Sequence, residues 1–465
     1  MHYAAAGEER SAHEYSLLAA DQALALYENG AASTHLAAAA RTAPSDQALA
    51  EVRVRMASIA EGAGRYEEAE ALCEQALAYY EARGEQLLAL RVKRTRMMVR
   101  IQRGQSARDT LDALLELERE AREANASPER AAILLLISQT HWRLGDPLAS
   151  HRVAEESLEI AERVGDRLLI ADACIRCGLT VQFADAARAR TLYLRALEIS
   201  TQLGDILRRV RCLINLSIME LIESNWDESR AAAQSAIDEA RTAGLTEMWG
   251  HAALNLGVTE ARIGEYDTAA EHLGQALQLC AAVQNSQLQL YATYNIAHLE
   301  RDRGRHRQAG DTYELVVALA ERIGQAEVQA GARAGYGLAQ LQGGHEGAAR
   351  EAAARVREFL DSRPDWFQGR ELAEALLLRL KRLDGGVTEM PRMFERAIAL
   401  ADTTDVYAAA VLTAEFWDDI HPLAPDLMEG AARRYGTRPE VLGNPKIRDR
   451  FAVLLFDSKS TIDRS

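Results

Sequence analysis

The sequence predicts an all-α solenoid of stacked antiparallel helix pairs, and three observations lead to this prediction. Hydrophobic residues make up 48% of the 465 residues, although aromatic residues make up only 6%, because alanine supplies much of the apolar share. Alanine has the highest helix propensity, and only nine prolines interrupt the chain. The third observation is a repeat of about forty residues that carries two regular breaks.

The breaks fall into two series, each with the period of the repeat. One series marks the end of the first helix of each pair, at Gly64, Gly104, Gly145, Ala184, Ser224, Gly264, Gly304 and Gly344. The other marks the end of the second helix, at Gly84, Ala124, Gly165, Gly204, Gly244, Gln284 and Gly324. Glycine suits both places because a helix commonly ends at a residue in the left-handed conformation, which other side chains resist. Two breaks in each repeat predict two helices in each repeat.

The residues after the first break predict how the second helix packs. Aromatic residues follow the break at Tyr66, Trp226 and Tyr266. Small residues come three positions later, at Ala69, Ser229 and Ala269, and again seven further on, at Ala76, Ala236 and Ala276. Residues at this spacing share one face of a helix, so we expect a buried stripe of small side chains that lets paired helices approach closely.

The segment NLGVTEARIGEYDTAAEHLGQAL (255–277) resembles the tetratricopeptide repeat, with Leu-Gly in the first helix, Gly-x-Tyr at the turn and spaced alanines in the second helix. The forty-residue variant resembles the repeats of kinesin light chain and of the Leu-Gly-Asn adaptors. It also resembles the helical arms of bacterial signalling ATPases and transcription activators. The resemblance implies a right-handed superhelix whose first helices line a concave, peptide-binding surface.

The repeats suggest three segments. We expect an N-terminal helical pair that caps the stack over residues 1–45, and an array of about eight repeats over 46–363. Residues 364–465 are expected to form a divergent C-terminal helical cap with a short tail, because the pattern decays and prolines become frequent there. Within it we expect one irregular pair over 390–420 and two short helices over 423–457.

Charge and motifs exclude several kinds of function. The formal net charge of −15 argues against nucleic acid as a partner, since no basic block interleaved with aromatic residues offsets it. No segment has the roughly eighteen consecutive apolar residues that span a bilayer, and the N-terminus lacks the pattern of a signal peptide. Five cysteines within helical patterns argue against a disulfide framework. We therefore expect a cytoplasmic protein without nucleic-acid or membrane partners.

The sequence also offers no catalytic motif. It contains no phosphate-binding Gly-Lys loop, no H-E-x-x-H metal motif and no G-x-S-x-G nucleophile elbow. We therefore expect no cofactor, no metal and no enzymatic activity. The Cys174-Ile-Arg-Cys177 pair is assigned to the core, because both cysteines align with apolar positions of later repeats.

Three asparagines, Asn215, Asn255 and Asn295, occupy one position in three successive first helices. Asparagine is a poor residue for a helix interior, so its repetition at one position calls for a reason. One interpretation is a row of amides that bond the backbone of an extended peptide, as the resemblance implies for this position. The alternative is that each amide satisfies a neighbouring repeat or contacts water.

Helical geometry names the neighbours of these amides as further candidates for peptide or protein binding. Residues four before, three after and seven after an asparagine share its face. The resulting candidates are Arg211 and Ile218 beside Asn215, His251, Val258 and Arg262 beside Asn255, and Tyr291 and His298 beside Asn295. For Arg211 and Arg262 two alternatives remain: bidentate pairing with acidic side chains of a partner, or with glutamates of the next repeat.

Two other features are assigned structural roles. Glu220, Glu260 and Glu300 repeat at the same period but face elsewhere on the helix, so we expect each to pair with a nearby arginine or tyrosine. Trp366 and Phe367 end the clear repeats, where they either seal the stack or form an exposed anchor.

The leading hypothesis is thus a scaffold that binds a protein or peptide partner in the concave groove between residues 211 and 302. The alternative is a regulatory or sensor arm that acts in trans with a bacterial signalling ATPase, a transcription regulator or another effector enzyme.

Overall fold

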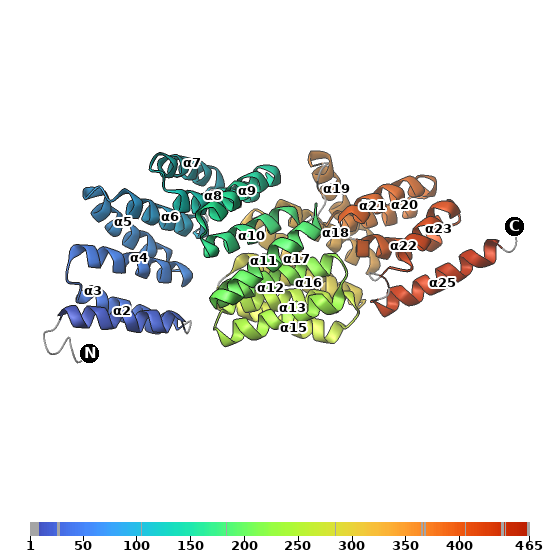
Figure 1. Ribbon diagram of the computed structural model, residues 1–465. Coiled ribbons are helices and arrows are strands. Elements are labelled where there is room, and N and C mark those ends of the chain that lie inside the picture. The colour runs from blue at the N-terminus through green and yellow to red at the C-terminus, as the bar shows by residue number, and fades with distance from the viewer. Residues whose placement is uncertain are drawn as a thin grey trace. The chain divides into compact units, whose positions relative to one another are not determined.

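The computed structural model describes residues 9–25, 28–103, 105–182, 184–283, 285–363, 366, 369–404, 406–438, 441 and 443–462. The described elements are all helical (Figure 1). The chain forms two compact units. The first unit holds residues 1–215 and 239–245, and the second holds 216–238 and 246–465. None of the described helices combines the length and the apolar character that crossing a bilayer needs.

The helices alternate between first and second members of antiparallel pairs. An N-terminal pair comprises α2 (Glu9–Ala25) and α3 (Asn29–Arg41). The first helices that follow are α4 (Asp46–Gly62), α6 (Gln86–Gln102), α8 (Ser127–Arg143), α10 (Arg167–Val181), α12 (Ile206–Ile222), α14 (Thr246–Arg262), α16 (Ser286–Asp302) and α18 (Ala326–Gln342). Their second helices are α5 (Tyr66–Ala82), α7 (Ala107–Glu123), α9 (Pro147–Val164), α11 (Ala186–Leu203), α13 (Trp226–Thr242), α15 (Tyr266–Val283), α17 (His306–Ile323) and α19 (Glu346–Ser362).

The C-terminal region continues the alternation less regularly. It comprises α20 (Arg370–Leu383), a 3₁₀ turn η1 (Val387–Glu389), α21 (Met390–Thr404), α22 (Val406–Ile420), α23 (Pro425–Tyr435) and α25 (Pro445–Ile462). The irregular pair expected over 390–420 corresponds to α21 and α22, whereas α20 was not expected. The proposed division into 1–45, 46–363 and 364–465 remains a prediction.

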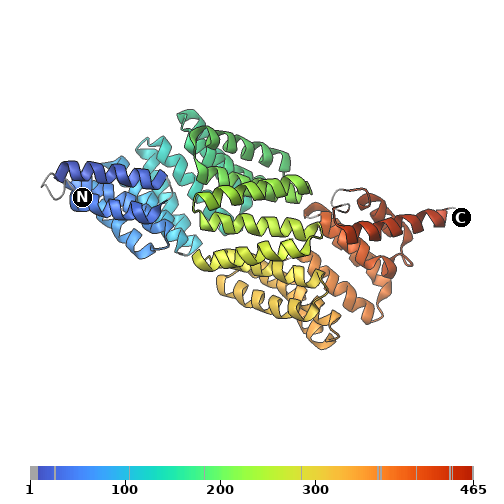
Figure 2. The same cartoon turned by 90° about the horizontal axis from the view of Figure 1, so that it is seen from below.

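Successive helices pack side by side within each unit (Figure 2). First helices also contact the first helix of the next pair, as α4 contacts α6 and α8 contacts α10 in the first unit, and α14 contacts α16 in the second. The buried residues accordingly form several clusters along the stack, such as one from Leu90 to Cys212 and another from Ala330 to Leu454. This is the predicted all-α arrangement of stacked antiparallel helix pairs.

The predicted breaks lie at the helix ends. Left-handed backbone occurs at Gly64, Gly145, Ser224, Gly264, Gly304 and Gly344 after first helices, and at Gly84, Gly165, Gly204, Gly244 and Gly324 after second helices. The break assigned to Ala124 is shifted by one residue, because Asn125 adopts the left-handed conformation with φ 53°. Asparagine tolerates this conformation better than alanine. The breaks placed at Gly104 and Gln284 lie outside the described residues.

The predicted stripe of small residues is confirmed. Ala69, Ala76, Ala236, Ala269 and Ala276 are fully buried, and so is Ser229, whose hydroxyl donates a 2.8 Å hydrogen bond to the carbonyl of Ser217. Because these side chains are short, the two helices of a pair come close enough for glycines of the first helix to receive large residues. Gly178 faces the ring of Tyr193, and Gly257 faces Leu273.

Buried cysteines and Trp366 behave as core residues. Cys174 and Cys177 are almost completely buried and carry free thiols. Burial raises the thiol pKa of Cys174 to about 11 and that of Cys177 to about 12. Neither value suits a redox pair, which needs an accessible thiolate. Trp366 is also buried, with its ring edge-on to Phe359, so it seals the stack; Phe367 lies outside the described residues.

The close approach at Gly257 gives a stability prediction. A Cβ atom there would lie 2.8 Å from Leu273 and 3.1 Å from the carbonyl oxygen of Ala269. Gly257→Ala should therefore destabilise the protein by about 1–3 kcal/mol, measured by urea denaturation. The matched control is Gly274→Ala in α15, where no atom lies within 4 Å, and which should stabilise the protein by up to about 1 kcal/mol. Equal effects of both substitutions would contradict this packing.

Candidate functional site

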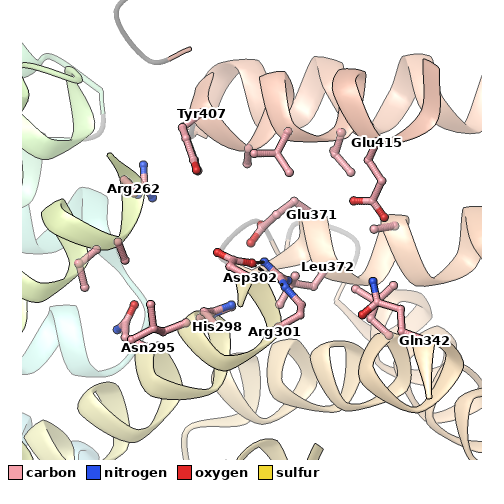
Figure 3. Close-up of a pocket in the computed structure, with 18 of the residues that line it drawn as sticks. Arg262, Asn295, His298, Arg301, Asp302, Gln342, Glu371, Leu372, Tyr407 and Glu415 are labelled. Atoms are coloured by element: carbon pink, nitrogen blue, oxygen red, sulfur yellow. Dashed lines mark hydrogen bonds and ion pairs between the residues drawn. The ribbon is translucent and has the colours of Figure 1, made fainter. Parts of the chain in front are cut away.

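The second unit contains a cavity of about 310 Å³ that we call the groove pocket (Figure 3). Its described walls come from the first helices α14, α16 and α18 and from the C-terminal helices α20 and α22. Leu273 of α15 is the one described lining residue that belongs to a second helix. The pocket therefore forms where the helix faces that are not used for pairing converge.

Helix α16 supplies the floor of the groove pocket. Asn295, His298, Leu299 and Asp302 line it, at the i, i+3, i+4 and i+7 spacing of a single helix face. Val258, Ala261 and Arg262 occupy the corresponding stretch of α14. The sequence thus places a mixed stripe of polar and apolar side chains on each of two adjacent first helices.

Charged side chains gather in the middle of the groove pocket, where Arg301, Asp302 and Glu371 lie close together in Figure 3. The Arg301 guanidinium donates two hydrogen bonds, of 3.1 and 2.9 Å, to Oδ1 of Asp302. Burial works against the charged form of Arg301, but Asp302, together with Tyr313 and Glu415, outweighs it and raises the pKa of the guanidinium. Arg301 therefore stays cationic in the pocket.

His298 is a neutral polar group in the floor. Burial lowers its pKa well below the usual range, and the nearby charges of Arg301 and Arg262 lower it further. Its Nδ1 lies 3.1 Å from the Tyr313 hydroxyl, and its ring packs against Tyr294 with centroids 4.3 Å apart. An imidazole held in this way serves as a fixed hydrogen-bonding surface.

The far wall comes from the C-terminal region. Helix α20 contributes Glu371 and Leu372, and α22 contributes Tyr407 and Glu415. The Tyr407 ring lies under the Arg262 guanidinium at 5.2 Å, and Figure 3 shows both at one edge of the pocket. Glu415 is paired with Arg379, whose Nε lies 2.7 Å from Oε1. The wall thus contributes the carboxylates of Glu371 and Glu415 and the ring of Tyr407 to the pocket.

Asn444 ties this wall to the repeats. Its amide nitrogen donates hydrogen bonds to the carbonyl of Arg262 at 3.0 Å and to the Tyr407 hydroxyl at 3.1 Å, and it is almost completely buried. Lys446 then donates to the carbonyl of Asp302 at 3.3 Å and lies 4.8 Å from the centre of the Tyr266 ring. Asn444 and the first turn of α25 therefore fix one rim of the groove pocket.

The structure brings four of the predicted site residues together in the groove pocket: Val258, Arg262, Asn295 and His298. The other six lie elsewhere. Asn215 and Asn255 are buried, and Arg211, Ile218, His251 and Tyr291 are partly buried on α12, α14 and α16 without lining the pocket. Their role in binding remains a prediction.

The three amides have three different environments. The Asn295 amide is half-buried, and its nitrogen donates to the carbonyl of Tyr291 at 2.8 Å. The Asn255 nitrogen donates to the Ser217 hydroxyl at 2.8 Å. Asn215 as a whole residue is only 7% exposed, and its side-chain nitrogen has no hydrogen-bond partner among the described residues. Equal spacing in the sequence therefore does not give equal presentation to a ligand.

The glutamate row supports the turns instead of a ligand site. Glu220 accepts a 2.7 Å hydrogen bond from the Asn225 amide, Glu260 lies 2.8 Å from Nδ1 of His272, and Glu300 pairs with Arg305. Glu300 has the arginine partner that the sequence suggested. At Glu220 the described partner is an asparagine of the turn, and at Glu260 it is a histidine of the second helix.

Sequence reasoning missed the residues of the far wall, above all Glu371, Tyr407 and Asn444. No motif or period connects them with Asn295, so no local signal pointed to them. The prolines that precede α25 marked only an irregular region.

A family model described as the tetratricopeptide repeat matches residues 49–82, which span most of α4 and α5. A comparison with curated protein sequences finds no match.

Two solved structures are similar in fold. One is a Rap protein in complex with competence and sporulation factor, with a TM-score of 0.54 and 16% sequence identity, covering 82% of this chain and 99% of that chain. The other is a signal transduction ATPase with numerous domains and a tetratricopeptide repeat sensor, from Pyrococcus horikoshii, with a TM-score of 0.53 and 14% identity, covering 74% of this chain and 52% of that chain. At these identities the likeness concerns the fold alone.

The Glu260–His272 pair predicts a pH dependence of stability. Its hydrogen bond to Glu260 raises the pKa of His272 in the folded protein, and burial only partly opposes this. The stabilisation is complete below the ordinary histidine pKa of about 6.5 and is lost as the pH rises through the folded value. Above about pH 6.5 the free energy of unfolding should therefore fall with a component that His272→Gln lacks.

The measurement is urea denaturation between neutral and mildly alkaline pH, with a histidine NMR titration to locate the pKa of His272. Glu260→Gln should remove the same component, because it removes the partner. Parallel pH profiles of the wild type and His272→Gln would contradict the assignment.

Proposed function

Since the chain is a tetratricopeptide-repeat protein, we propose that it is a non-catalytic scaffold and that a peptide segment of a partner protein binds in the groove pocket. The observation that carries this proposal is the origin of the pocket walls, which come almost entirely from first helices. A surface built from equivalent faces of successive repeats runs along the stack and suits an extended ligand.

The chemistry of the lining supports a peptide ligand. Leu299, Leu372 and Leu412 offer apolar contact, while Arg262, Asp302 and Glu371 offer charges of both signs. The Asn295 oxygen remains available as an acceptor for a backbone N–H group, because the nitrogen is the atom that bonds to the Tyr291 carbonyl. A mixed lining with a few placed polar groups is typical of sites that fix the orientation of a ligand.

The volume of the groove pocket limits how much of a peptide it can hold. A volume of about 310 Å³ lies at the lower end of the range for ligand pockets. We propose that it receives one or two anchoring side chains of the peptide and that the flanking residues lie along the first helices. Binding would then be concentrated in a few residues, as is usual for protein interfaces.

The described lining also argues for binding in place of catalysis. It includes no serine, threonine, cysteine or lysine side chain that would serve as a nucleophile. Nδ1 of its histidine lies near the Tyr313 hydroxyl, and its arginines are engaged with Asp302 and Tyr407.

The proposal predicts a loss of peptide affinity on substitution of the pocket. Short peptides selected from a random phage-displayed library against the wild-type chain should bind Asn295→Ala and Arg262→Gln at least about tenfold more weakly, measured by fluorescence polarisation. The matched control is Gln234→Ala, which removes an exposed amide from the second helix α13 and should leave affinity unchanged.

Circular dichroism and denaturation midpoints must show that each variant is folded. Selected peptides that bind the pocket variants as tightly as the wild type would remove the groove pocket from the proposal. A selection that yields no peptide above background would do the same.

A second candidate function is a regulatory arm that acts in trans with an effector such as a signalling ATPase. The likeness in fold to the sensor of a signal transduction ATPase favours it. Purified chain should then change the ATP hydrolysis rate of a co-purifying ATPase, and Asn295→Ala should change it less. An ATPase rate that does not respond to the wild-type chain would exclude that effector.

A further inference from the structure

Residues 443–446, which end in the first turn of α25, cross back onto the repeats, and we call them the clasp. The clasp and all the residues that it contacts belong to the second unit. Asn444 donates a hydrogen bond to the carbonyl of Arg262, which lies 182 residues earlier in the chain. In a stack of helix pairs each repeat contacts mainly its neighbours. The clasp is therefore a cross-connection between distant parts of the second unit.

The clasp bonds to equivalent positions of successive repeats. Arg262 is the last residue of α14, and Asp302 is the last residue of α16. Their carbonyls accept hydrogen bonds from Asn444 at 3.0 Å and from the ammonium group of Lys446 at 3.3 Å. The last carbonyls of a helix have no partner within the helix, so these donors satisfy them. The positive charge of Lys446 also suits the negative end of the α16 dipole.

Two aromatic residues at equivalent positions complete the contact. Trp226 is the first residue of α13, and Tyr266 is the first residue of α15. A Cβ atom on Gly443 would lie 2.4 Å from Nε1 of Trp226, so glycine allows the clasp to lie against the indole. The ammonium group of Lys446 lies 4.8 Å from the centre of the Tyr266 ring, as in a cation–π contact. The clasp thus follows the forty-residue period of the repeats.

The clasp also joins two walls of the groove pocket. Arg262 lines the pocket on α14, and Tyr407 lines it on α22 (Figure 3). The Asn444 amide bonds to the carbonyl of the first and to the hydroxyl of the second. Without such a connection, the distance between α14 and α22 would depend on the curvature that accumulates from repeat to repeat. The clasp fixes this distance directly.

Docking of the clasp depends mainly on Asn444. This residue is 2% exposed, whereas Pro445 and Lys446 are exposed. Its two polar atoms have separate roles. The nitrogen bonds to Arg262 and Tyr407, and Oδ1 accepts a 3.0 Å hydrogen bond from the backbone N–H of Lys446 at the start of α25. A substitution that removes only the nitrogen therefore separates docking from the capping of α25.

We propose that the clasp is a releasable closure of the groove pocket. While the clasp is docked, the walls on α14 and α22 stand at the distance that forms the pocket, and on its release the walls part. A peptide that fits the closed pocket then stabilises the docked clasp, and the docked clasp strengthens binding of the peptide, because the two equilibria are linked. This linkage rests on the function proposed for the groove pocket, whereas the closure itself does not.

The closure is tested without a ligand. Ala375 lines the groove pocket and is 3% exposed, so the thiol introduced by Ala375→Cys should react slowly with iodoacetamide. Asn444→Asp keeps the oxygen that caps α25 but loses both donated hydrogen bonds, and it should increase this reaction rate at least about tenfold. Gly443→Ala should also increase the rate, because its Cβ atom displaces the Trp226 ring.

Gly430→Ala in α23 is the matched control, since no atom lies within 4 Å of its Cβ position, and it should leave the rate unchanged. Cys73 is completely buried in the first unit and reports global unfolding in the same sample. Mass spectrometry of proteolytic peptides distinguishes the two thiols. Equal rates in all variants, or a parallel increase at Cys73, would overturn the proposal.

The linkage is tested by hydrogen exchange, with a peptide selected from the random phage-displayed library as the probe. Saturating peptide should slow exchange of the α25 amides in the wild type at least about fivefold, although no described residue of α25 lines the pocket. Asn444→Asp should abolish this effect. Tight binding without slower exchange in α25 would overturn the linkage and leave the proposed function in place. A selection that yields no peptide would remove the proposed function and the linkage together, and the thiol rates alone would then decide the closure.

Discussion

The structure depends on the close approach of the two helices in each pair. Ala69, Ala76, Ala269 and Ala276 of the second helices are fully buried, and their short side chains let each second helix approach its first helix closely. The approach is closest at glycines of the first helix such as Gly257, where Leu273 occupies the space that a Cβ atom would fill. Interiors tolerate little excess volume, so the repeated stripe leaves few alternative arrangements for the pairs.

Because each first helix packs against its second helix with one face, another of its faces can line a binding surface. In the second unit those faces converge on the groove pocket, with Asn295 and His298 on α16. A pocket between equivalent faces would be open at one side without a further wall. The C-terminal helices α20 and α22 supply that wall, and Asn444 holds it through the Arg262 carbonyl and the Tyr407 hydroxyl.

Arginines on the first helices are held by nearby carboxylates or aromatic rings. In the groove pocket, Arg301 is balanced by Asp302, and Arg262 lies over an aromatic ring. In the first unit, Arg208 of α12 pairs with Asp172 of α10 and with Asp205. An ion pair between neighbouring first helices fixes which turns of the two helices meet.

The sequence by itself determined the helix pairs, because the left-handed residues that end helices and the small residues that permit close packing recur with one period. The helix break predicted at Ala124 is wrong by one residue, because Asn125 adopts the left-handed backbone and asparagine tolerates it better than alanine. Helical spacing also brought Val258, Arg262, Asn295 and His298 to adjacent faces. Only the tertiary structure decided which amides are accessible, and that Tyr407 and Asn444 complete the pocket, because contacts between residues so far apart in the chain leave no local pattern.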